Sequence, residues 1–339
     1  MKHTNGYAHS LSGTIVSAAA CILLTCTVLA FSDEPDGPRE PRVSIEPRVR
    51  TRDSAERTST NIRVSSNLVL IPVTVTDHFD RFVTGLEKPS FRLYEDKVEQ
   101  TILHFTSEDA PISIGVVFDC SSSMDHKISK SREAVGQFLK TANPGDEFSL
   151  VTFANYPQLL VRLTREAAEI QRRLAMTRPS GRTALLDAIE MSIREMKNAH
   201  HSRKALLIIS DGGDNCSRYT MREIKNLVRE ADVQIYAIGI LEPFGPESRP
   251  VEELAGPGLL REITEQTGGL MFEVNNWKQL PDVASKIGVA LRHQYVLGYS
   301  PADLQNDGKY HRVQVKLDLP KGGPKLRASW RLGYYAPKQ

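Results

Sequence analysis

The chain has 339 residues, of which 43 are Lys or Arg, 41 are Asp or Glu, and 40% are hydrophobic. This length accommodates two domains, and the formal net charge of +2 gives no general electrostatic attraction to nucleic acid or to an anionic membrane. Four cysteines are too few for a fold built on disulfides, and 22 glycines and 19 prolines exclude a fibrous chain.

The N-terminus has the pattern of an export signal. Lys2 and His3 precede an apolar run over 15–31, and residues 30–32 fit a small-x-small cleavage site. The run is slightly shorter than the roughly 20 residues of a membrane-spanning helix. We therefore expect residues 1–32 to be a signal peptide or a retained N-terminal membrane anchor. The mature protein is then exported, and is periplasmic, on the cell surface or secreted.

Residues 33–65 contain four prolines among mixed charges and few large apolar residues. Such a segment buries too little apolar surface to offset its ordering entropy. The composition predicts a disordered linker. It is either a spacer for the folded part or an exported N-terminus without a role of its own.

Two segments, 66–108 and 293–339, have the period-two pattern of β-strands with turn residues between them. The expected strands cover 68–76, 82–84, 91–95, 98–105, 294–299, 311–317 and 326–333. The strands of the first segment are predicted to form a meander in one small antiparallel sheet. Because so few strands are marginal alone, we predict that the two segments pair into one β-sandwich-like domain.

Residues 109–292 alternate apolar strands with amphipathic helices. The expected strands cover 112–118, 148–153, 159–163, 205–209, 233–240 and 270–274, and the expected helices 127–141, 165–175, 183–197, 221–230, 259–266 and 277–291. This alternation predicts an α/β fold with a doubly wound, mostly parallel sheet covered on both sides. The α/β domain is inserted in, or flanked by, the antiparallel β domain.

Oxygen-bearing side chains stand at three places next to these strands. Asp119, Ser121 and Ser123 follow the first strand, Thr183 opens a later helix, and Asp211 follows the strand over 205–209. In open parallel sheets, ligands bind outside the carboxyl ends of the strands. Two carboxylates and three hydroxyls there suit a hard cation, Mg²⁺ or else Mn²⁺ or Ca²⁺, with one coordination position left open. The absence of histidine from these loops disfavours softer metals.

These motifs resemble a known site. D-x-S-x-S at 119–123, a helix-opening threonine at Thr183 and S-D-G at 210–212 are similar to the metal-ion-dependent adhesion site (MIDAS) of von Willebrand factor A (VWFA) domains. The resemblance covers roughly 112–292. The flanking segments, with LIPVTVTDHFDRFVTGL before and YVLGYSPADLQNDGKYHRVQVKLDL after, resemble the exported VWFA-related proteins of Acidobacteria. One position departs from the family pattern, because Arg182 stands where a glycine is usual.

The resemblance implies metal ligands and a function. The implied direct or water-mediated ligands are Asp119, Ser121, Ser123, Thr183 and Asp211, and the open position is implied to take a carboxylate of a protein partner. The implied function is protein binding or adhesion, with no catalysis. The net charge and the single long apolar run predict no nucleic acid partner and no membrane contact beyond an N-terminal anchor.

An enzyme is the alternative, namely a phosphatase- or esterase-like hydrolase that uses the same cation. Other enzyme classes lack their motifs. A phosphatase with an aspartate nucleophile needs a second aspartate where Ser121 stands, and neither G-x-G-x-x-G after the first strand nor G-x-S-x-G occurs.

Some of these residues also have simpler interpretations. Asp119 and Asp211 suit the caps of strand ends and helix starts, and Asp214 and Asn215 are predicted to form a turn rather than to bind metal. Cys120 and Cys216 stand in two of the site loops. In an exported protein they form either a disulfide or two separate thiols, and sequence spacing does not decide between these.

Overall fold

The computed structural model describes residues 68–107, 109–241, 251–301, 308–320 and 322–336. The predicted export segment and linker lie outside these ranges. Within them, no helix combines the length and the apolar character needed to cross a membrane.

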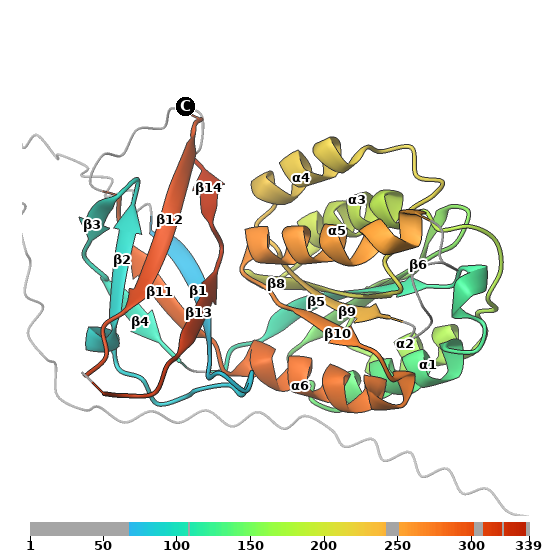
Figure 1. Cartoon of the computed structure of the whole chain (residues 1–339), viewed down its shortest axis with the longest axis horizontal. Coiled ribbons are helices and arrows are strands. Elements are labelled where there is room, and N and C mark those ends of the chain that lie inside the picture. The colour runs from blue at the N-terminus through green and yellow to red at the C-terminus, as the bar shows by residue number, and fades with distance from the viewer. Residues whose placement is uncertain (1–67, 108, 242–250, 302–307, 321, 337–339) are drawn as a thin grey trace, which may run out of the picture. The chain divides into compact units, whose positions relative to one another are not determined.

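A six-stranded sheet forms the centre of the α/β part (Figure 1). Its order is β10-β9-β8-β5-β6-β7, and all neighbours are parallel except β7, which is antiparallel to β6. The strands are β5 (Ile112–Asp119), β6 (Glu147–Phe153), β7 (Pro157–Thr164), β8 (Arg203–Ser210), β9 (Gln234–Ile240) and β10 (Met271–Val274). Because β5 and β8 are interior strands, both of their faces are covered, which explains their continuous apolar runs.

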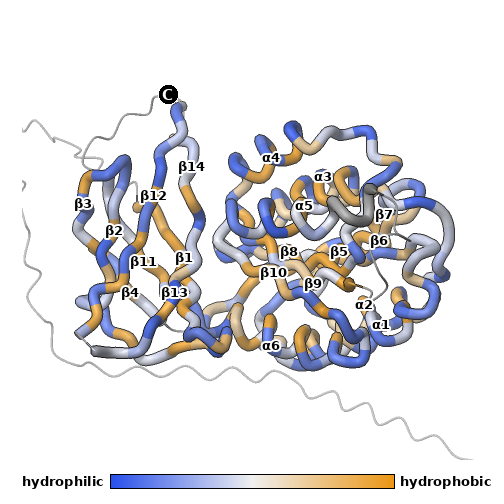
Figure 2. Tube along the Cα trace, in the orientation of Figure 1, coloured by the Kyte–Doolittle hydropathy of each residue, from blue (hydrophilic) through white to orange (hydrophobic). Residues whose placement is uncertain are grey.

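Helices cover both faces of this sheet (Figure 1). One layer holds α1 (Ile128–Leu139), α2 (Ala167–Ala175) and α6 (Leu280–Arg292), and the other holds α3 (Leu185–Glu195), α4 (Met221–Glu230) and α5 (Val251–Thr267). Successive residues of β5 serve different cores, since Val116 and Phe118 belong to the first and Val117 to the second. Apolar residues gather along the central strands (Figure 2). The predicted doubly wound α/β fold is confirmed.

The β part consists of two four-stranded antiparallel sheets, ordered β13-β1-β11-β4 and β14-β12-β2-β3. Its strands are β1 (Val69–Thr76), β2 (Phe91–Glu95), β3 (Val98–Gln100), β4 (His104–Thr106), β11 (Tyr295–Tyr299), β12 (Tyr310–Leu317), β13 (Arg327–Trp330) and β14 (Gly333–Tyr335). Each sheet combines strands from before and after the α/β part. The predicted pairing of the two β segments around an inserted α/β domain is therefore confirmed.

The predicted single meander is wrong. β1 and β2 lie in different sheets, and the segments expected as one strand each over 98–105 and 326–333 are each divided into two strands. The expected strand at 82–84 makes only an isolated bridge between Thr76 and Phe82. Its turn is closed by Asp77, whose Oδ1 accepts the amides of Phe79 and Arg81 at 2.8 and 3.0 Å. Alternating apolar residues do not say to which of two facing sheets a strand belongs, so the pattern alone could not separate them.

Both connections between the β part and the α/β part meet at one buried ion pair. Asp146 accepts the amide of Ile112, the first residue of β5, at 3.0 Å. Arg292, the last residue of α6, donates through both terminal nitrogens to the two carboxylate oxygens of Asp146. Both side chains are buried. Arg292 also lies 3.5 Å from Asp109, so this pair holds the chain where it enters and where it leaves the α/β part.

Candidate functional site

The two predicted carboxylates leave adjacent strands at the same edge of the central sheet. Asp119 is the last residue of β5, and Asp211 directly follows β8. The strands are parallel, with Phe118 opposite Ile209. This is the edge at which open parallel sheets bind ligands.

Asp119 is fully buried and held by two hydrogen bonds. Its Oδ1 accepts the amide of Ser121 at 2.8 Å, and its Oδ2 accepts the hydroxyl of Ser210 at 2.6 Å. Burial, together with the nearby negative charge of Asp211, raises the pKa of Asp119 to about 7. The folded protein thus keeps an ionisable acid where its charged form is poorly stabilised, which is typical of a site that receives a cation.

The two serine hydroxyls of the first loop lie together. The Oγ atoms of Ser121 and Ser123 are 3.0 Å apart, and the following Met124 is fully buried and anchors the short 3-10 turn η2 (Ser122–Met124). The amide of Ser122 donates to the carbonyl of Gly181 at 3.1 Å, which brings the first loop against the loop before α3.

Thr183 is buried and is held by the loop after β8. Its amide donates to Oδ1 of Asn215 at 2.9 Å, and the amide of Asn215 donates back to the carbonyl of Thr183 at 3.0 Å. Asp214 accepts the amide of Leu186, in the first turn of α3, at 3.2 Å. Asp214 and Asn215 thus bind backbone amides, as their predicted turn role requires, and tie two site loops together.

The departure at Arg182 is accommodated by its neighbour. Gly181 takes the left-handed backbone conformation with φ +79°, and Arg182 is not among the described residues with positive φ. The amide of Arg182 donates to Oδ1 of Asn155 at 2.8 Å, and its guanidinium donates to the carbonyl of Asn215. The arginine therefore closes the loop instead of distorting it.

Of the two carboxylate oxygens of Asp211, one has a hydrogen-bond partner and the other has none among the described residues. Its Oδ2 lies 3.3 Å from the ammonium of Lys127, whereas its buried Oδ1 has no hydrogen-bond partner among the described residues. The next residue, Gly212, has φ +86° and packs so closely on α5 that a Cβ at Gly256 would lie 2.0 Å from the Gly212 carbonyl oxygen. These two glycines fix the position of the Asp211 loop.

The prediction from sequence did not include Ser210 or Lys127. Ser210 was visible in the S-D-G motif, but nothing in the pattern said that its hydroxyl donates to Asp119. Lys127 occupies the N-cap of α1, a position that disfavours a cation because the helix dipole is positive there. A lysine at this unfavourable position indicates that an acidic side chain from another part of the chain contacts it, and this was the signal in the sequence.

These residues fit a hard divalent cation. The donor atoms are carboxylate and hydroxyl oxygens, which Mg²⁺ prefers, and the orphaned Oδ1 of Asp211 lacks the partner that a buried carboxylate oxygen requires. Within the described ranges no group of three or more His, Cys, Asp or Glu side chains is arranged to hold a metal. A cation here would therefore depend on the hydroxyls of Ser121, Ser123 and Thr183 as well as on the two aspartates.

The raised pKa of Asp119 predicts that protons compete with the metal. The pKa of Asp119 in the folded protein lies above its ordinary value, so the protonated side chain stabilises the metal-free protein. This stabilisation is full below about pH 4 and is lost as the pH rises through about 7. Metal binding needs the ionised form, so the apparent affinity for Mg²⁺ should fall by about tenfold per pH unit below 7. Mg²⁺ titrations between pH 5.5 and 8 at fixed ionic strength measure this slope, and a constant affinity would contradict it.

Cys120 and Cys216 are two free thiols in the structure. Cys216 Sγ donates toward the carbonyl of Asn155 at 3.5 Å, and Cys120 is buried beside Thr177. Burial raises the pKa of both thiols, to about 11 for Cys120. The disulfide left open by the sequence is not formed, and neither thiol has the depressed pKa of a reactive cysteine.

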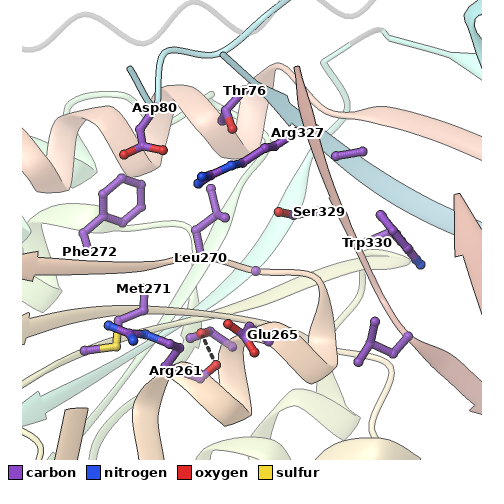
Figure 3. Close-up of a pocket in the computed structure, with 14 residues that line it drawn as sticks. Thr76, Asp80, Arg261, Glu265, Leu270, Met271, Phe272, Arg327, Ser329 and Trp330 are labelled. Carbon is purple, nitrogen blue, oxygen red and sulfur yellow. Dashed lines mark hydrogen bonds between the residues drawn. The ribbon is translucent and has the colours of Figure 1, made fainter. Parts of the chain in front are cut away.

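A cavity of about 510 Å³ is lined by none of the five predicted ligands. It lies between α5 and β10 on one side and β1 and β13 on the other, and Arg327 extends into it toward Leu270 and Asp80 (Figure 3). A smaller cavity of about 340 Å³ is lined by Cys120, the residue after Asp119, and by Ser180.

The chain is similar to several known proteins. The model of the von Willebrand factor type A domain matches residues 113–286. An uncharacterized protein of Borreliella burgdorferi is 26% identical over 189 residues, which cover 49% of this chain and 55% of that protein. Inter-alpha-trypsin inhibitor heavy chain H4 of Homo sapiens is 25% identical over 201 residues, covering 55% of this chain and 21% of that protein. The chain thus matches about half of the first relative's length and a fifth of the second's.

Two solved structures are also similar. The von Willebrand factor type A protein from Catenulispora acidiphila has a TM-score of 0.47 at 13% identity, covering 81% of this chain and 74% of that one. The conserved hypothetical protein BatB from Bacteroides thetaiotaomicron has a TM-score of 0.42 at 17% identity, covering 53% of this chain and 98% of that one. With the family model matching over half of its residues, the chain belongs to the von Willebrand factor type A domain family.

Proposed function

We propose that this chain is an exported protein-binding module, with an adhesive or assembly role, that engages an acidic group of a protein partner through a divalent cation. The cation is Mg²⁺, with Mn²⁺ or Ca²⁺ as alternatives, and its direct or water-mediated ligands are Asp119, Ser121, Ser123, Thr183 and Asp211. Export rests on the N-terminal sequence pattern.

The observation that carries the proposal is the buried pair of aspartates at the strand ends. Asp119 is ionisable at a position where burial opposes its charge, and the nearby Asp211 has a buried oxygen without a partner among the described residues. Buried carboxylates of this kind are stabilised by pairing or by metal coordination. The serine hydroxyls next to Asp119 add neutral oxygen donors.

The charge of the ligand set supports an acidic partner. Two carboxylates balance the charge of a divalent cation, and the other three ligands are neutral hydroxyls. The ammonium of Lys127, 3.3 Å from Asp211, adds one positive charge to the site. A cation at this site keeps an affinity for a further anionic oxygen. A carboxylate from a protein partner supplies one.

The surroundings favour a partner segment that is both acidic and apolar. Arg178 and Arg182 are exposed, while Tyr156 and Met176 expose 62% and 82% of their surfaces although they are large apolar residues. Tyr156, Met176 and Arg178 line the 340 Å³ cavity that also reaches Cys120, next to Asp119. Exposed aromatic, methionine and arginine side chains are enriched in protein interfaces.

We also propose that the site makes and breaks no covalent bond. A metal-dependent hydrolase needs a base for the attacking water. Both carboxylates of the site are proposed ligands of the cation, which leaves neither of them as that base. The hydrolase alternative is tested together with binding.

Peptide binding tests this function. Immobilised peptides that contain one aspartate or glutamate, flanked by apolar residues, should retain the protein in Mg²⁺ and release it in a chelator. Matched peptides with asparagine or glutamine should not retain it, because a neutral amide oxygen is a weaker ligand for a positively charged site. Equal retention of acidic and amide peptides would contradict the proposal. Turnover of p-nitrophenyl phosphate or acetate that requires Mg²⁺ would favour the hydrolase.

A further inference from the structure

A buried lysine lies inside the candidate metal site. Lys127 stands at the N-cap of α1, and its side chain is 3% exposed. Its Nζ lies 3.3 Å from Oδ2 of Asp211, whose side chain is 8% exposed. Both desolvation and the positive end of the helix dipole disfavour an ammonium at this place. The ammonium is therefore stabilised by the carboxylate of Asp211.

The lysine contacts one side of Asp211 and leaves the other side open. Oδ2 interacts with the ammonium, and the buried Oδ1 has no partner among the described residues. The other carboxylate of the site, Asp119, accepts hydrogen bonds from Ser121 and Ser210. The ammonium thus contacts one of the two carboxylates, and one oxygen of that carboxylate stays available.

We propose that Lys127 is the internal counter-cation of this site and sets its metal affinity. This inference rests on the proposed function, because it needs the five ligands to bind a divalent cation. In the metal-free protein the ammonium partly neutralises Asp211 and supports the loop after β8. The same ammonium would repel a divalent cation held by Asp211, so the affinity would be lower than the oxygen ligands alone would provide. The site then fills only where divalent cations are abundant.

A purely structural salt bridge makes a different prediction. If Lys127 only held the Asp211 loop in place, removing it would weaken both the folded protein and metal binding. A counter-cation gives effects of opposite sign, because removing it destabilises the metal-free protein and strengthens metal binding. The two roles are therefore separated by measuring stability and affinity on the same variant.

The experiment uses the full chain after treatment with a chelator, and the probe is Mg²⁺ alone. Lys127→Met keeps the length of the side chain and removes its charge. We expect a lower unfolding midpoint without metal, a Mg²⁺ affinity raised by about tenfold in calorimetric titration, and a larger rise of the midpoint with Mg²⁺ than in the natural protein. Lys130→Met, on the exposed side of α1 beside Glu133, is the matched control and should change neither quantity.

The outcomes separate the two claims. Metal binding by the natural protein with unchanged or weaker binding by Lys127→Met overturns the counter-cation role and leaves the metal site standing. Mg²⁺ binding by Lys127→Met, with none by the natural protein, would give the strongest support to the counter-cation role. No Mg²⁺ binding by any of the three proteins overturns both claims. Should Lys127→Met fail to fold, Lys127→Gln retains an amide donor for Asp211 without the charge and decides by the same criteria.

Discussion

Replacing Asp119 with asparagine is expected to stabilise the metal-free protein and to abolish Mg²⁺ binding. The carboxylate is fully buried, and burial with the neighbouring Asp211 opposes its ionisation at neutral pH. Asparagine keeps an acceptor for the amide of Ser121 and offers its amide to Ser210, but carries no charge. The free energy of unfolding without metal should rise by about 1–4 kcal/mol, as when other buried charges are replaced by neutral groups.

Urea denaturation at pH 8, with and without Mg²⁺, measures both effects. The natural protein should gain stability from Mg²⁺, and Asp119→Asn should gain none. Asp125→Asn is the matched control, because this exposed aspartate lies in the same loop and its replacement should alter neither value. A large loss of stability in Asp119→Asn would show instead that the carboxylate is a structural cap.

Replacing Asp146 with alanine is expected to destabilise the whole folded unit by about 3–5 kcal/mol. The change leaves the guanidinium of Arg292 buried without its carboxylate and removes an acceptor from the amide of Ile112. It acts where the chain enters and leaves the α/β part. Because the β part needs both of its sequence segments held together, we expect the two parts to lose stability together.

Thermal unfolding followed by near- and far-ultraviolet circular dichroism tests this expectation. Glu133→Ala, which breaks the exposed pair with Lys130 on α1, is the control and should cost no more than about 0.5 kcal/mol. A change of similar size in both variants would refute a special role of the buried pair.

The α/β fold was predictable because its strongest signals are local. Interior strands such as β5 and β8 are covered on both faces, so they appear in the sequence as continuous apolar runs, and the amphipathic helices between them fix the parallel direction. The helix α4 was predicted with its observed bounds. Its capping box, in which Thr220 and Glu223 bond each other's backbone amides, is a local feature of the same kind.

The β part was predicted less completely because its pairing is not local. Strands β1 and β11 are adjacent although more than 200 residues separate them, and a period of two says nothing about partners. The boundaries between β3 and β4, and between β13 and β14, depend on where the chain crosses from one sheet to the other.

The candidate site, too, was predictable where its signals are local and not where they depend on distant contacts. Asp119, Asp211 and their hydroxyl neighbours were found because strand ends and loop motifs are visible in sequence, and their role as ligands stays a prediction. Lys127 was missed because its contact with Asp211 spans 84 positions and depends on the packing of α1 against the strand ends. Only its unfavourable place at a helix N-terminus gave a hint.

The central claim is that this chain holds one divalent cation at the ends of β5 and β8. Electron paramagnetic resonance of Mn²⁺ tests it most directly, because free Mn²⁺ gives a strong six-line spectrum that broadens on binding. Titration into the chelator-treated full chain should show one bound Mn²⁺ per chain, displaced by excess Mg²⁺ and absent from Asp119→Asn. Equal binding by the natural protein and Asp119→Asn, or no binding by either, would contradict the claim.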